Sequence, residues 1–382
     1  MGNETNRAIA DLLDELAAGL QGGALGPKVR VGITLPGSEH GEEELLRAAL
    51  LAQAQLPAAE ITVIGSLSAP GLRAVEAASL KEAHARMEEL LQAGELDAAV
   101  TLHYSFPIGV ATIGRVVTPA LGRSMYIAST TGASSAHRVS AMVRNAVSAQ
   151  AVAQACGCAE PTLGILNVDG AQQVLRALQR LQAGGYPLRF AQSAREDGGA
   201  IMRGNDLLQG VPDIMLVDSL TGNLLVKTLS AFATGGSYEA VGDGYGPGAG
   251  SGQGRTVLII SRASGAPVVA GALKYAAACA LGKLPQKVQA HYALAEKAGL
   301  SAILAELEQP PAAAQQVTAP PATVVNEEIT GVDVLAIEDA VHALWRRGLY
   351  ATGGMGCTGP VVMVASENAE AALAILREEK YL

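Results

Sequence analysis

A cysteine near the C-terminus lies among glycines, in the stretch from Gly353 to Pro360. Core cysteines usually pack among branched apolar neighbours and behave as small hydrophobic residues. Around Cys357, glycines leave room for a bulky acyl-bearing partner, and their backbone N–H groups can point at a developing oxyanion. Such a setting favours a nucleophilic thiolate. We therefore expect Cys357 to carry or receive an acyl group. The alternative is a glycine-rich turn before a buried strand.

A second stretch follows an expected strand and opens an expected helix, from Asp218 to Lys227. Thr221 and Gly222 would begin this helix, where exposed N–H groups can bind an anion. Asn223 can donate a hydrogen bond to an acyl carbonyl or a phosphate oxygen, and Lys227 lies one turn further on the same face. The pattern predicts an oxyanion and phosphate site. A well-capped helix with an exposed lysine would give the same pattern without a ligand.

Small hydroxylated residues mark another strand-to-helix turn, over residues 130–138. Thr131 and Ser134 suit phosphate binding at the start of a helix, and Arg138 and Arg144 would add positive charge. An N-capping turn is the alternative interpretation.

Three further polar residues are candidates for a binding site, two of them in the cleft of Asn223. Asn205 and Asp206 would line it beside Asn223, unless they only cap a short helix. His103 ends an expected strand, the position at which ligands bind in many α/β folds. A structural histidine with satisfied hydrogen bonds is the slightly favoured alternative.

Several motifs argue against other chemistries. The glycine-dominated segment 242–255 lacks dinucleotide spacing and runs into a strand, so we expect a mobile surface loop over a cleft. Cys156 and Cys158 have no further cysteine or histidine cluster nearby, so we expect no metal site. A Walker A motif and a nucleophile-elbow serine are both absent from the sequence.

The elements that would position these residues alternate along the chain, which predicts an α/β fold with a mixed, mostly parallel sheet covered on both faces. The expected strands are 29–33, 61–64, 98–102, 125–128, 162–166, 214–217 and 257–260. The expected helices are 8–20, 42–55, 81–92, 139–156, 171–183, 223–232 and 268–281.

Two Pro/Ala-rich segments divide the chain, because they cannot continue a helix and lack a core-forming pattern. We expect an α/β domain over 1–308, a linker over 309–325, and a small C-terminal α/β unit over 326–382. Within that unit the sequence predicts a helix at 337–347, a strand at 361–365 and a helix at 367–377 with Ser366 as its N-cap. So small a unit should dock on the larger body or on another subunit.

Composition excludes some partners. The net charge of −9 argues against a nucleic-acid backbone as partner. The sequence shows no signal-peptide pattern and no long apolar run, so we expect no membrane span. Four cysteines in 382 residues do not form a disulfide framework, and we expect a cytoplasmic location.

The segments 201–206, 212–218 and 221–227 together resemble the phosphate acyltransferases of bacterial phospholipid synthesis. The resemblance implies an isopropylmalate-dehydrogenase-like fold, a three-layer sandwich, and exchange of an acyl thioester for an acyl phosphate. It lies mostly in residues 95–235. Residues 34–39 replace the Gly-Gly-Asp type loop of those enzymes, which argues against long-chain acyl carrier protein as substrate.

A further resemblance extends over nearly the whole chain. The motifs at 103–110, 142–146 and 354–362 are similar to those of the alpha subunits of component C of glycine/sarcosine/betaine reductase complexes. This resemblance implies that inorganic phosphate cleaves an enzyme-bound acetyl thioester to acetyl phosphate. It also implies a hetero-oligomer with a beta subunit resembling a ketoacyl synthase, and with the selenoprotein component A. No cofactor or metal is expected. Inorganic phosphate would be a substrate.

The resemblance implies roles for the candidate residues. Cys357 would be the acetyl carrier, Asn223 an oxyanion or phosphate donor, and Lys227 a phosphate anchor. Three alternatives remain open. One is a phosphate acyltransferase that uses acyl carrier protein or coenzyme A, and another is a non-catalytic scaffold subunit. The third, a nicotinamide-dependent decarboxylating dehydrogenase, is disfavoured because the sequence lacks a paired Asp-x-x-x-Asp.

Overall fold

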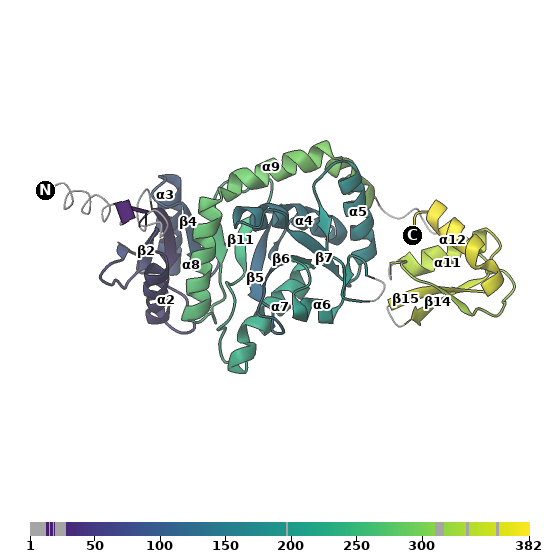
Figure 1. Cartoon of the computed structure of the whole chain (residues 1–382), viewed down its shortest axis with the longest axis horizontal. Helices are drawn as coiled ribbons and strands as arrows, with labels where there is room; N and C mark the ends of the chain where they lie inside the picture. Colours follow the sequence, from purple (N-terminus) through teal and green to yellow (C-terminus); the bar gives the residue numbers. More distant parts are fainter. Residues whose placement is uncertain are drawn as a thin grey trace.

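The computed structural model describes residues 13, 14, 16, 17, 19, 28–195, 198–309, 317–333, 336–356 and 359–382. Figure 1 shows a large body with helices on both sides of a central sheet, and a smaller α/β unit at the C-terminal end. The described residues form one 12-stranded sheet and a separate three-stranded sheet. Most of the expected helix at 8–20 lies outside these residues.

The large sheet has the order β3-β2-β1-β4-β12-β11-β5-β6-β10-β7-β8, with β9 also paired to β7. Its strands are β1 (Val29–Thr34), β2 (Ala59–Gly65), β3 (Arg73–Glu76), β4 (Ala98–Thr101), β5 (Val110–Val117), β6 (Ser124–Ala133), β7 (Thr162–Leu166), β8 (Arg189–Phe190), β9 (Ile201–Met202), β10 (Ile214–Leu216), β11 (Gly246–Ala249) and β12 (Val257–Ile259).

The sheet consists of two parallel halves that run in opposite directions. β11 pairs antiparallel with both β12 and β5, and β5 pairs antiparallel with β6, whereas the other neighbours are parallel. The carboxyl ends of β1, β2, β4 and β12 therefore lie at one edge of the sheet. Those of β6, β7, β9 and β10 lie at the opposite edge.

Helices cover both faces, which confirms the predicted three-layer α/β architecture. One face packs against α2 (Glu42–Gln55), α4 (Arg138–Ala155), α5 (Ala171–Ala183), α8 (Ala266–Leu281), α9 (Leu284–Lys297) and α10 (Leu300–Leu307). The other packs against α3 (Leu80–Gln92), α6 (Gly204–Gln209) and α7 (Ser219–Ala231). By itself, none of the described helices has the length and apolarity to cross a membrane. α8 and α9 together satisfy length and composition, with a 62° bend between them.

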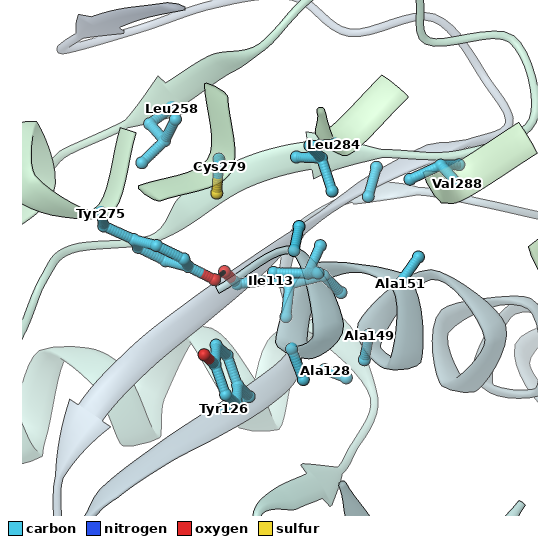
Figure 2. Packing of buried hydrophobic residues seen from close by; sticks show 14 of the residues in the cluster. Ile113, Tyr126, Ala128, Ala149, Ala151, Leu258, Tyr275, Cys279, Leu284 and Val288 are labelled. Atoms are coloured by element: carbon cyan, nitrogen blue, oxygen red, sulfur yellow. Dashed lines mark hydrogen bonds between the residues drawn. The ribbon is translucent and has the colours of Figure 1, made fainter. Parts of the chain in front are cut away.

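The core at the junction of the two halves combines small residues with a few large ones (Figure 2). Ala149 and Ala151 lie on α4, and Tyr275 and Cys279 on α8. Tyr275 is completely buried, and its hydroxyl donates a 3.0 Å hydrogen bond to the carbonyl of Ile113 on β5 (Figure 2). Alanines let α4 approach the sheet closely, and this brings its ends to the sheet edges.

The prediction of a mobile loop over 242–255 is wrong for its centre. Gly246–Ala249 is β11, buried between β12 and β5. A Cβ at Gly246 would lie 1.8 Å from the Ile113 carbonyl oxygen, and one at Gly248 would lie 2.3 Å from the Phe106 ring. These glycines therefore permit close backbone packing. The sequence concealed the strand because it lacks the branched side chains that mark strands.

The C-terminal unit has a sheet of order β13-β15-β14, built from β13 (Glu327–Ile329), β14 (Ala351–Gly356) and β15 (Gly359–Val364). α11 (Ile337–Arg346) and α12 (Ala369–Glu378) share its hydrophobic cluster. The glycine-rich stretch is therefore strand up to Gly356. The predicted N-cap is also wrong, because Ser366 begins a 3₁₀ turn and its hydroxyl donates to Asn326 Oδ1.

Candidate functional site

A cavity of about 250 Å³ lies at the carboxyl edge of β6 and β10, where two predicted turns meet. Ser134 and Arg138 line it from the turn after β6, and Asp218 and Leu220 line it from the start of α7. The hydroxyl of Ser134 donates a 2.6 Å hydrogen bond to Asn145 Oδ1, and both residues are buried. Ser134 is thereby held at the cavity wall by α4.

Arg138, which lines this cavity, forms ion pairs with two carboxylates. Arg138 lies 3.3 Å from Asp218 Oδ2 and 3.5 Å from Asp169 Oδ2. The side chain of Asp169 is 58% exposed, whereas that of Asp218 is 16% exposed. Burial opposes ionisation of Asp218, but hydrogen bonds from Thr221 and the charge of Arg138 outweigh it and lower its pKa. Asp169, which is the more exposed carboxylate and the more distant one, is therefore the candidate for displacement by an anion.

The N-terminus of α7 already has an acceptor. Asp218 is the N-cap and accepts hydrogen bonds from Thr221 N at 3.1 Å and Thr221 Oγ1 at 2.6 Å. The Gly222 N–H donates to the Asp218 carbonyl. The prediction of open N–H groups at Thr221 and Gly222 is therefore wrong. A carboxylate stands where the phosphate was expected, because an aspartate side chain is an effective N-cap.

Asn223 and Lys227 lie one turn apart on α7, and neither lines the cavity described above. Asn223 Nδ2 donates to the carbonyl of Thr130 at 3.1 Å. Lys227 Nζ lies 3.2 Å from Glu239 Oε1 and 3.1 Å from Ser261 Oγ, beyond the carboxyl end of β12. Partial burial opposes the charge of Lys227, but Tyr245 and Glu239 outweigh it, so the pKa of Lys227 is raised.

Sequence reasoning missed Glu239 and Ser261, the two partners of Lys227. Glu239 is almost completely buried, and its Oε2 accepts a 2.8 Å hydrogen bond from Ser264 Oγ. No spacing in the sequence links these residues to α7. The available signal for this pair of residues was Glu239 itself, an isolated acidic residue beside a segment of small residues.

Asp206 has a structural role. It is buried, and its carboxylate accepts hydrogen bonds from Ser193 Oγ, Ala194 N and Arg203 N at 2.8–2.9 Å. Burial opposes ionisation, yet these bonds lower the pKa of Asp206. The structure thus contains the capped short helix, α6, and a functional role of Asp206 stays a prediction. Asn205 is exposed on that helix, and neither Asn205 nor Asp206 lines the cavity described above.

His103 and Thr131 also lie apart from that cavity. His103 is exposed and follows β4, whose carboxyl end is at the opposite edge of the sheet. The reversal of direction at β11 and β5 puts it there. Thr131 is half-buried, and its carbonyl accepts a 3.4 Å hydrogen bond from Thr112 Oγ1.

A second cavity, of about 460 Å³, lies at the carboxyl ends of β7 and β9. Its polar lining includes Asn167, Asp169, Arg195 and Arg203, and Pro360 of β15 contributes from the C-terminal unit. The Asp169–Arg138 ion pair connects its wall with that of the smaller cavity.

Cys357 lies outside the described residues. Within the described part of the chain, no group of three or more His, Cys, Asp or Glu side chains is arranged to hold a metal ion.

Comparison with known proteins places the chain in a family. A family model described as fatty acid synthesis protein matches residues 29–363. The alpha subunit of glycine/sarcosine/betaine reductase complex component C from Peptoclostridium acidaminophilum is 49% identical over 379 residues, 98% of each chain. A phosphate acyltransferase from Azorhizobium caulinodans is 24% identical over 246 residues, 54% of this chain and 69% of that protein.

Among solved structures, a branched-chain phosphotransacylase from Enterococcus faecalis aligns with a TM-score of 0.47 and 17% identity, over 66% of this chain and 99% of the other. The family model covers most of the chain, and the reductase relative matches it end to end. The chain therefore belongs to the fatty acid synthesis protein family and, within it, to the alpha subunits of component C of the glycine/sarcosine/betaine reductase complexes.

Proposed function

We propose that this chain takes part in acetyl transfer from an enzyme-bound thioester to inorganic phosphate, giving acetyl phosphate within a reductase complex. The observation that carries the proposal is its identity to a component C alpha subunit over nearly the whole of both chains. Relatives named phosphate acyltransferase support acyl transfer to phosphate in general. The proposed partners are the component C beta subunit and the selenoprotein component A.

In the proposed reaction, Cys357 carries the acetyl group as a thioester. A phosphate oxygen attacks the carbonyl carbon, and the carbonyl oxygen becomes an oxyanion that needs hydrogen-bond donors. The C–S bond then breaks, its electron pair leaves with the sulfur, and acetyl phosphate departs from the Cys357 thiolate. Phosphate is itself the nucleophile, so the reaction needs no serine–histidine pair.

We place the phosphate in the cavity lined by Ser134 and Arg138, where it would replace Asp169 as a partner of Arg138. The Asp169 ion pair is long and exposed, and pairs of that kind contribute about 0–1 kcal/mol. An Arg–phosphate contact is charge-assisted and can be bidentate, so it can outcompete this pair. Asp218 is less exposed and also caps α7, so we expect it to stay.

Asn223 and Lys227 remain proposed donors with spare capacity. The Asn223 amide has two N–H donors, and the bond to Thr130 uses one. The Lys227 ammonium has three, and the bonds to Glu239 and Ser261 use two. We propose Asn223 as the oxyanion donor and Lys227 as a second anchor for anions. Pro360, three residues beyond Cys357, lines the larger cavity, which supports an encounter between the thioester and this edge of the sheet.

The deciding experiment measures acetyl phosphate formation by the purified chain with its partner subunits. We expect Cys357→Ala to abolish the activity and Cys158→Ser, the matched thiol control, to retain it. Mass spectrometry after labelled substrate should find acetyl on Cys357. Label confined to the partner subunit would remove Cys357 from the mechanism and make this chain a scaffold.

The second candidate is a phosphate acyltransferase that takes acyl groups directly from acyl carrier protein or coenzyme A. The match to a phosphate acyltransferase over 54% of this chain favours it. This function predicts acyl phosphate formation without Cys357. Full activity of Cys357→Ser with acyl-coenzyme A and phosphate would therefore support the second candidate over the first.

A further inference from the structure

Two thiols meet in the interior, at the end of α4 opposite to the candidate site. Cys156 is the C-cap of α4, Cys279 lies in the last turn of α8, and their Sγ atoms are 3.7 Å apart. Cys156 is partly exposed, whereas Cys279 is completely buried. A disulfide bond is about 2.05 Å long, so an approach of about 1.7 Å would close one.

The backbone around the two thiols is already close. A Cβ at Gly282, the C-cap of α8, would lie 2.0 Å from the carbonyl oxygen of Ala155, the last residue of α4. The two helix ends therefore touch directly beside the cysteines. A disulfide requires short Cα–Cα and Cβ–Cβ distances, and helix ends in contact favour both.

The surroundings make the two thiols unequal. A hydrogen bond from Cys279 stabilises the Cys156 thiolate, and together with the charge of Arg115 it outweighs burial and lowers the pKa of Cys156. The carbonyl end of α4 works against this thiolate. Burial raises the pKa of Cys279 well above its usual value. Cys156 is thus the thiol that ionises first and the one that solvent reaches.

We propose that Cys156 and Cys279 form a dithiol–disulfide site, in which Cys156 reacts with a low-molecular-weight disulfide and Cys279 resolves the product. The Cys156 thiolate attacks one sulfur of the disulfide, and the other leaves as a thiolate. Cys279 then loses its proton to that thiolate and attacks the Cys156 sulfur, releasing the second thiolate. The chain loses two electrons, and the external disulfide is reduced to two thiols. This site is independent of the proposed acyl transfer.

The crosslink would connect the two halves of the large sheet. α8 packs on α2 and on β1 and β4 of the first half, and α4 packs on β6 and β10 of the second. The cysteines are separated by 123 positions, so the bond would close a long loop of the unfolded chain. We therefore expect the oxidised chain to melt at a higher temperature than the reduced chain, by roughly 5 °C.

The test treats the full-length, natively folded chain with oxidised glutathione at pH 8 and then maps its peptides without reduction. We expect a Cys156–Cys279 linked peptide to form, the melting temperature to rise, and dithiothreitol to reverse both. Cys158→Ser is the matched control and should behave like the wild type. A crosslink between Cys156 and Cys158, or no Cys156–Cys279 linked peptide from the folded chain, overturns the proposal.

A variant tests the order of the two steps. Cys279→Ala removes the resolving thiol, so Cys156 should retain a glutathione adduct that adds one glutathionyl group to its peptide. Circular dichroism of the variant confirms that it is folded. Absence of an adduct on Cys156 in the folded variant contradicts the assignment of Cys156 as the reactive thiol. If the Cys279→Ala variant does not fold, the peptide map of the wild-type chain still tests the proposed disulfide.

Discussion

At the scale of single residues, the properties of the candidate site depend on how its charges are paired. Arg138 is shared between a mostly buried and a mostly exposed carboxylate, and Lys227 is held by the buried Glu239. If an anion drew Lys227 away from Glu239, the buried Glu239 carboxylate would lose its counter-ion, which costs several kcal/mol. The exposed Asp169 carries no such penalty. The site can therefore admit an anion more easily at Arg138 than at Lys227.

This asymmetry gives a prediction for phosphate binding. Arg138→Gln should raise the KM for phosphate about tenfold, the equivalent of about 1.4 kcal/mol, with kcat changed less. Asp169→Asn should lower that KM about two- to threefold, because it removes a competing carboxylate. Steady-state kinetics with varied phosphate measure both, and Arg189→Gln, an exposed ion pair elsewhere, is the control. A higher KM in Asp169→Asn would contradict the proposed exchange of partners.

At the scale of elements, α7 is positioned by its contact with β6. A Cβ at Gly222 would lie 1.8 Å from the carbonyl oxygen of Ser129, a backbone atom that cannot rotate away. Glycine at this position therefore lets the N-terminal turn of α7 press against the strand. The same contact places Asp218 and Leu220 at the cavity wall.

Gly222→Ala should accordingly destabilise the protein by about 3 kcal/mol through overpacking. The matched control is Gly204→Ala on α6, where a Cβ meets nothing within 4 Å. Urea denaturation measures both variants. An unchanged midpoint for Gly222→Ala would show that α7 can move away from β6 at little cost.

A second contact between elements is pH-sensitive. His291 on α9 accepts a 2.7 Å hydrogen bond from the Tyr186 hydroxyl at Nδ1 and donates from Nε2 to Gln154 Oε1 of α4 at 3.1 Å. This pattern requires the neutral imidazole. Burial, helped by the charge of Lys287, lowers the pKa of His291 to about 4. In the unfolded chain the imidazole titrates near 6.5.

Because the folded-state pKa is the lower one, the unfolded chain takes up the proton first as the pH falls below about 6.5. The contribution of His291 to stability is therefore complete above that pH and is lost as the pH falls through about 4, by roughly 3 kcal/mol in total. Urea midpoints at pH 7, 5.5 and 4.5 measure the loss. His291→Gln should show a smaller decline, and an equal decline in both proteins would exclude His291 as its source.

At the scale of the whole molecule, we propose that residues 1–308 and 326–382 are separate domains joined by 309–325. Their hydrophobic clusters share no residue. Arg176 on α5 donates a 3.2 Å hydrogen bond to the carbonyl of Tyr381, yet a cavity of about 1,000 Å³ remains between α5 and the C-terminal unit. A contact that leaves so much space is typical of domains that can separate.

Truncation after residue 324 tests this organisation. The shortened chain should keep the far-UV circular dichroism per residue and the main thermal transition of the full chain, because its core is intact. It should lose acetyl phosphate formation, since Cys357 is removed. An aggregated truncated chain would show that the two cores depend on each other, and retained activity would exclude the C-terminal unit from the reaction.

By itself the sequence determined the helices and strands with a strong local period. The predicted bounds of α2, β7 and α5 agree with the structure, because amphipathic spacing and flanking turn residues suffice to define them. The alternation of such elements also gave the three-layer architecture. The alternative of a capped short helix at Asp206 was likewise available from a local pattern.

Only the tertiary structure decided how these elements are oriented and which charges meet. β11 is nearly devoid of side chains and exists because its neighbours bury it, so no local pattern predicts it. The three successive antiparallel pairings, β12–β11, β11–β5 and β5–β6, reverse the strand direction and separate His103 from Arg138. The partners of Arg138 and Lys227 come from other segments, and the free energy of burying a charge depends on those contacts rather than on spacing along the chain.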